Sequence, residues 1–205
     1  EIIEYLVEND SQGNPSIRQY GVVDLVDDGR SAAFTGENCY DYKNHILGPT
    51  YSIQGNILLG QEVLDSMEVN FLNTSGSLAS RLIAAMQGAK IPGADTRCLS
   101  SGISSLSAFI RVAQPNNLED SLYLHLNVNN TQPGIDPIDT LQDLFDDWYA
   151  ENPDLVTIQV DFNEGWNLVG LPAYIDDAGY SSMFPEAITG TLFSFGSGYI
   201  SESEL

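Results

Sequence analysis

The chain has 205 residues, and its hydrophobic content of 42% is enough to form the core of one large domain or two small ones. Its formal net charge is -22, because 29 acidic residues face only 7 lysines and arginines, and residues 112–205 contain neither of these bases. This balance argues against nucleic acid or an anionic membrane as a partner, and no apolar run reaches the roughly 18 residues of a membrane-spanning helix.

The acidity of the chain is typical of an extracellular or salt-adapted surface, so we expect a secreted or cell-surface protein. The sequence has no D-x-D-x-D-G calcium loop, and we expect neither a metal ion nor a cofactor. A metal-dependent acidic protein stays as a rival interpretation. Cys39 and Cys98 allow one disulfide bond. Sequence does not give their distance, so both a bridge and two separate thiols are left open.

The first part of the chain is rich in strand patterns. Residues 1–8 have apolar side chains at helical spacing and are followed by turn formers. Two β-rich runs, 17–26 and 31–36, flank an Asp-Gly turn and predict a hairpin. Residues 35–49 have the composition of a loop, and 48–60, GPTYSIQGNILLG, predict a buried strand.

Helical patterns dominate next. Residues 60–74 and 75–90 predict two amphipathic helices joined by a Ser-Gly-Ser link, with a serine cap before the second helix. A glycine- and serine-rich loop leads into two alternating strands at 106–113 and 121–128, where His125 is expected to face solvent. A last amphipathic helix follows, and Pro153 ends it.

The order of these elements predicts a layered α+β domain over residues 1–152, with helices packed on antiparallel sheet. From residue 153 onward the chain is rich in β-formers and turns and poor in helix patterns. We therefore expect a domain boundary near residues 152–156 and a small β-rich segment at 153–205. Both ends of the chain are expected to lie inside a longer protein.

Two carboxamides, Gln54 and Asn56, interrupt the apolar strand on either side of Gly55. Residues two apart on a strand share a face, and amides that point at one atom can stabilise an oxyanion. They can also cross-link backbone between sheets, which is the more common role of such amides. His45, in the expected loop before this strand, suits acid or base chemistry near neutral pH, but a single loop histidine is more often structural.

A second pair of candidates lies in the glycine- and serine-rich loop. Asp95 and Arg97 form an ion pair in the default interpretation, whereas the guanidinium fork could instead bind a substrate carboxylate. Five serines stand between residues 100 and 107 without a G-x-S-x-G motif, which argues against a serine-hydrolase triad.

Five segments in order resemble the domain of unknown function 1028 family over about residues 1–150. They are RQYGVVD at 18–24, GRSAAFTGENC at 29–39, NHILGPTYSIQGNILLGQEVLDSM at 44–67, LASRLIAAMQGAK, and GADTRCLSSGISSLSAFIRV. The resemblance implies an N-terminal-nucleophile (Ntn) hydrolase-like fold, a four-layer α/β/β/α sandwich of two antiparallel sheets between helical layers. The sandwich is expected to be incomplete here.

The Ntn class implies a mechanism as well. Its nucleophile is a Thr, Ser or Cys at the start of the first strand, and the α-amino group of that residue serves as the base. Glu1 has neither hydroxyl nor thiol. We therefore expect the nucleophile and the first strands to be missing from this chain, and the chain alone to be inactive.

The segment from about residue 156 includes GWNLVGLP, MFPEA and LFSFGSGYIS, and resembles the small β module that precedes sorting signals in secreted Bacteroidetes-type proteins. Together these features predict a secreted Ntn-type hydrolase acting on an amide-type bond. Its partner would be a small-molecule or peptide-like substrate, and self-association into a homo-oligomer is left open. The alternative is a non-catalytic extracellular binding or scaffold module on the same fold.

Overall fold

The computed structural model describes residues 1–115, 117, 121–153, 193–195 and 199–201. The chain divides into two units, residues 1–156 and 157–205, and each is described by itself. In the second unit the described residues are the short antiparallel strands β7 (Phe193–Phe195) and β8 (Tyr199–Ser201). The expected β-rich module lies otherwise outside the described residues, and its boundary stays a prediction.

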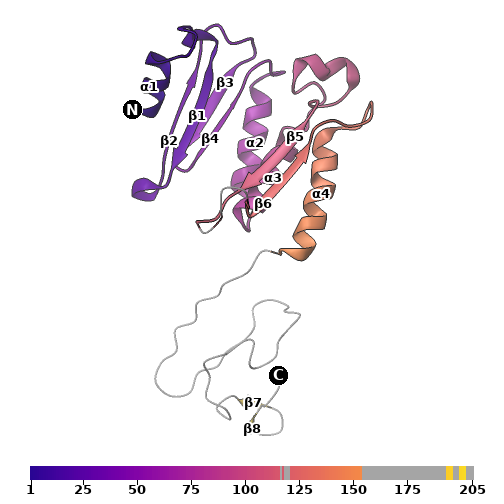
Figure 1. Cartoon of the computed structure of the whole chain (residues 1–205). Helices are drawn as coiled ribbons and strands as arrows, with labels where there is room; N and C mark the ends of the chain where they lie inside the picture. Colours follow the sequence, from indigo (N-terminus) through magenta and orange to yellow (C-terminus); the bar gives the residue numbers. More distant parts are fainter. Residues whose placement is uncertain (116, 118–120, 154–192, 196–198, 202–205) are drawn as a thin grey trace. The chain divides into compact units, whose positions relative to one another are not determined.

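The first unit begins with helix α1 (Ile2–Glu8) and two antiparallel hairpins. Strand β1 (Gln19–Asp24) pairs with β2 (Arg30–Thr35), which confirms the hairpin predicted around the Asp-Gly turn. Strand β3 (Asn44–Gly48) pairs with β4 (Tyr51–Gly55). The hairpins pack together through β1 against β4 and β2 against β3 (Figure 1).

Strand β3 corrects the sequence analysis, which assigned its residues to a loop. The composition around it is polar and rich in turn formers, and the strand itself has only five residues. Its partner decides its conformation, because the tight turn at Pro49 and Thr50 places Ile46 opposite the buried Ile53. The ladder then pairs the backbone groups that each strand turns toward the other.

Helices α2 (Gln61–Asn73) and α3 (Leu78–Gly88) pack against each other, as the two periodic segments predicted. The Ser77 hydroxyl accepts a hydrogen bond from the Ser80 amide at 3.2 Å, which confirms the expected serine cap. Helix α2 contacts the hairpin β3–β4, and α3 contacts β5, so this helix pair joins the two halves of the unit (Figure 1).

The main hydrophobic core lies in the second half of the unit. Strands β5 (Ala108–Val112) and β6 (Leu124–Val128) form an antiparallel pair, and helix α4 (Pro137–Glu151) packs on it. Burial alternates along β5, as a strand with one face on a core requires. His125 is exposed, as predicted. The core residues are Ala79, Ile83, Ala108, Ile110, Val112, Leu124, Val128, Ile138, Leu141 and Phe145.

One buried polar link fixes helix α4 to the loop before β5. The Asp136 carboxylate caps α4 by accepting from the Ile138 amide at 2.9 Å. It also accepts from the amide and the hydroxyl of Ser104, at 2.6 and 2.9 Å, and Ser104 is only 1% exposed.

These helices and strands confirm the expected mixed α+β domain. In the described residues its sheets are small and antiparallel.

Replacing Asp136 with alanine should lower the free energy of unfolding by about 2 kcal/mol, because α4 loses its cap and the buried Ser104 loses its acceptor. The control is Asp143→Ala, at an exposed position of the same helix, which should change it by less than about 0.5 kcal/mol. Urea denaturation measures both values. Equal losses in the two variants would contradict this assignment.

Candidate functional site

The predicted residues His45 and Gln54 lie directly opposite each other in the β3–β4 ladder. Because cross-strand partners project from the same face of a sheet, imidazole and carboxamide are neighbours. The Gln54 carboxamide also lies over Gly21 of β1, where an added β-carbon would overlap it. Gly21 thus leaves room for this side chain between the two hairpins.

Asn56 follows the last residue of β4, and its amide nitrogen donates to Gln19 Oε1 at 3.2 Å. Gln19 and Gly21 are two apart on β1, so both predicted carboxamides contact the same strand of the neighbouring hairpin. Both are exposed side chains, and Gln54 accepts a further hydrogen bond from the Ser52 hydroxyl at 2.7 Å. Gly55 between them lies against the Leu58 side chain.

Gln19 is the centre of this polar network. Its amide nitrogen donates to the carbonyls of Asn44 and Gly55 at 3.1 and 3.0 Å and to the Thr35 hydroxyl at 3.0 Å. The Thr35 hydroxyl lies 2.9 Å from His45 Nδ1. The network therefore runs from Asn56 through Gln19 and Thr35 to His45, and joins both hairpins.

The backbone next to Asn56 is strained. Ile57 has a φ of 61°, in the left-handed region that a β-branched residue rarely adopts. Hydrogen bonds hold it in place: its amide donates to the Tyr40 carbonyl at 3.1 Å, and its own carbonyl accepts from the Thr96 amide at 3.0 Å. Strained residues held by their surroundings are a feature of functional sites, so this segment is a site candidate on its own evidence.

The predicted pair Asp95 and Arg97 lies beside the same segment, because Asp95 forms a β-bridge with Leu58. Asp95 caps a short 3-10 helix, η3 (Thr96–Ser101), and binds the Arg97 guanidinium through both carboxylate oxygens. The guanidinium lowers the pKa of Asp95. Arg97 is thereby paired within its own loop.

Cys39 and Cys98 are both buried and are not bridged to each other. The Cys39 thiol donates to the Arg18 carbonyl at 3.3 Å. Burial raises the pKa of the Cys98 thiol, which opposes formation of the thiolate that a nucleophile needs. Among the described residues no group of three or more His, Cys, Asp or Glu could hold a metal ion, and no helix is long and apolar enough to span a membrane.

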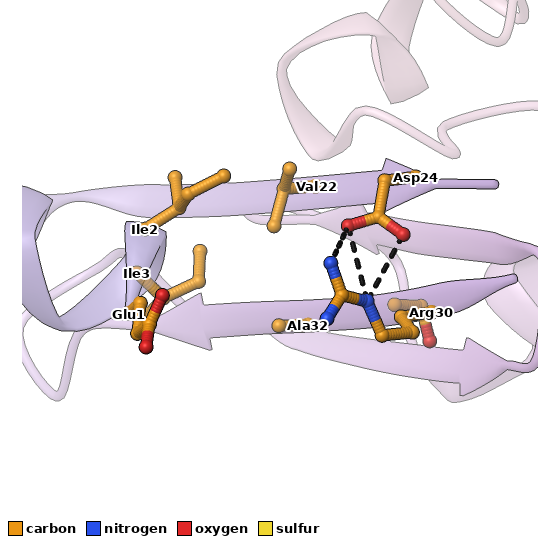
Figure 2. A pocket seen from close by; sticks show the side chains of 8 residues that line it. Glu1, Ile2, Ile3, Val22, Asp24, Arg30 and Ala32 are labelled. Atoms are coloured by element: carbon orange, nitrogen blue, oxygen red, sulfur yellow. Dashed lines mark hydrogen bonds and ion pairs between the residues drawn. The ribbon is translucent and has the colours of Figure 1, made fainter. Parts of the chain in front are cut away.

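A cavity of about 250 Å³ lies away from the network, between α1 and the hairpin β1–β2. Figure 2 shows Ile2, Ile3 and Val22 lining it beside the Asp24–Arg30 ion pair. Since Asp24 and Arg30 in its lining pair with each other and none of the predicted site residues lines it, we place the candidate site at the Gln19 network instead.

Over residues 1–141 the sequence matches the model of a family of unknown function, DUF1028. The chain belongs to the DUF1028 family. A crystal structure of a DUF1028 protein from Silicibacter pomeroyi matches this domain with a TM-score of 0.54 and 24% sequence identity, over 72% of this chain and 58% of that chain. That likeness shows the fold alone. No curated protein matches the sequence.

Two glycine variants test the geometry of this DUF1028 domain. Gly21→Ala should displace the flexible Gln54 amide, shift its side-chain NH₂ signals in ¹H–¹⁵N NMR spectra, and cost less than about 1 kcal/mol of stability. Gly36→Ala should cost more, about 2 kcal/mol, because a β-carbon there would overlap the backbone of Ser16. Unchanged Gln54 signals in Gly21→Ala would show that the amide does not lie over this strand.

Proposed function

We propose that this DUF1028 domain forms the oxyanion-binding and acid–base side of an Ntn-type site that hydrolyses an amide bond. The two packed hairpins would belong to the paired sheets of an α/β/β/α sandwich. The observation that carries the proposal is the position of His45 opposite Gln54, with Asn56 tied into the same network. An imidazole and a carboxamide on one face supply the proton transfer and the neutral donors that acyl transfer uses.

The charges of the domain favour a neutral substrate. Five of the seven basic side chains are in ion pairs, and the remaining two, Arg81 and Arg111, lie over the rings of Phe71 and Phe109. With a net charge of -22, the chain repels anions at long range. An uncharged amide in a peptide or small molecule fits this surface better than a carboxylate or phosphate.

The nucleophile is proposed to come from outside residues 1–205. Of the nearby groups, the Thr35 hydroxyl is half-buried at the end of β2 and the Cys98 thiol is 1% exposed. The chain spans 58% of the Silicibacter pomeroyi chain, so that protein has room for a segment of this kind. An extracellular location is proposed from the acidity of the chain. Arg97, held by its ion pair with Asp95, would orient a substrate near Asn56.

A binding or scaffold module on the same fold remains the second candidate, favoured by the exposed positions of Gln54 and Asn56. The two functions differ in the shape of the ligand that the hydrogen-bond donors bind more tightly. A hydrolytic site is complementary to a tetrahedral oxyanion, whereas a module has no reason to prefer it to a planar amide.

The test compares binding of a dipeptide amide and its phosphonamidate isostere to the full chain by calorimetry. It is run in about 1 M salt, where the Debye length of about 3 Å screens the net charge. We expect the tetrahedral analogue to bind roughly a hundredfold more tightly. Gln54→Leu should abolish most of this preference, and Gln132→Leu, at an exposed turn position, should keep it. Equal affinity for the two ligands would favour the module.

A further inference from the structure

We propose that Gln19 and Thr35 are positioning residues that fix the tautomer of His45, so that its Nε2 carries the proton and is presented as a donor. The inference builds on the proposed function, in which His45 faces the substrate. It depends on the direction of five hydrogen bonds in the network, and neither residue was predicted from the sequence.

The direction of the Gln19 carboxamide is set by groups that can only accept. Its nitrogen lies 3.1 and 3.0 Å from the carbonyls of Asn44 and Gly55, and a carbonyl oxygen has no proton to give. The NH₂ group must therefore face them. Its oxygen then faces Asn56, whose own NH₂ group donates to it at 3.2 Å.

This orientation determines what Thr35 does. The Gln19 NH₂ group shares its two protons among three acceptors, the two carbonyls and the Thr35 hydroxyl oxygen at 3.0 Å, so this oxygen faces N–H protons and the hydroxyl proton must point to another acceptor. Among the described residues the remaining partner of this hydroxyl is His45 Nδ1 at 2.9 Å. A protonated Nδ1 would leave the half-buried Thr35 proton without an acceptor, which costs about 1–3 kcal/mol. Thr35 therefore donates to Nδ1, and the imidazole proton is on Nε2.

The directions of these hydrogen bonds also determine which groups of the site donate and which accept. His45 presents an N–H donor, and Asn56, which donates one NH₂ proton to Gln19, keeps its second NH₂ proton as a donor and its carbonyl oxygen as an acceptor. A donor and an acceptor held in this way match the C=O and N–H groups of an amide. The network thus orients the two residues toward the substrate class that the proposed function names.

The experiment is ¹⁵N NMR of the histidine ring nitrogens in the full chain at about pH 8.5, where an ordinary histidine is neutral. The chain has two histidines, and the exposed His125 serves as an internal reference for an imidazole that exchanges between tautomers. We expect a single Nε2–H form for His45, with its Nδ1 signal shifted from that of His125 by the Thr35 hydrogen bond.

Two substitutions separate positioning from simple packing. Thr35→Val keeps the size of the side chain but removes the hydroxyl, so the His45 Nδ1 signal should move to the value of His125. Thr35→Ser should restore the wild-type signal, and Thr50→Val, at an exposed turn position, should leave it unchanged.

A proton on Nδ1 in the wild-type chain would overturn the proposal, even if Thr35→Val fails to fold. An unchanged His45 spectrum in a folded Thr35→Val variant would overturn it as well. Neither result depends on ligand binding or activity, so the proposed function can fail while this inference stands, and the reverse also holds.

Discussion

The hydrogen-bond network between the two hairpins depends on the Gln19 carboxamide. Asn44 and Gly55 are paired at the end of the β3–β4 ladder, and their carbonyls both accept from this one side chain. Each such hydrogen bond contributes about 0.5–1.5 kcal/mol, and an unmet carbonyl in a half-buried position costs about as much again. Gln19 therefore holds the second hairpin against the first, and the same side chain orders the groups around it.

This hydrogen-bonded link between the hairpins explains why neutral polar groups gather at one place in such an acidic chain. The charged side chains nearby are paired locally: Arg18 lowers the pKa of Asp10 through its hydrogen bond, and Arg97 does the same for Asp95. The network that links the two hairpins consists of imidazole, hydroxyl and carboxamide groups. The strained Ile57 lies directly beside them and is fixed by backbone bonds from two other segments.

The sequence predicted the elements whose pattern is local. Helices α2, α3 and α4 have periodic apolar faces over 11 to 15 residues, and the Asp-Gly turn gave the first hairpin. Strand β3 was missed, because five residues in a polar region have little pattern without their partner. The amides Gln54 and Asn56 were singled out because they interrupt an apolar run, which a single sequence can show.

The rest of the network could not be predicted, since it joins residues far apart in the chain. Gln19 reaches acceptors 16, 25 and 36 positions away, and each distance depends on hairpin register and packing. A glutamine at the start of β1 and a threonine at the end of β2 are ordinary strand residues. The link between Ser104 and Asp136 was hidden in the same way, 32 positions apart.

Hydrogen–deuterium exchange of Gln19→Leu tests most directly whether this one carboxamide joins the hairpins. Without its two carbonyl bonds, amides of residues 44–55 should exchange roughly tenfold faster, since about 1.4 kcal/mol of local stability is lost. Amides of α3 and α4 should keep their wild-type rates, because their core lies in the other half of the unit. Unchanged rates at residues 44–55, or an equal rise in α3 and α4, would contradict the account.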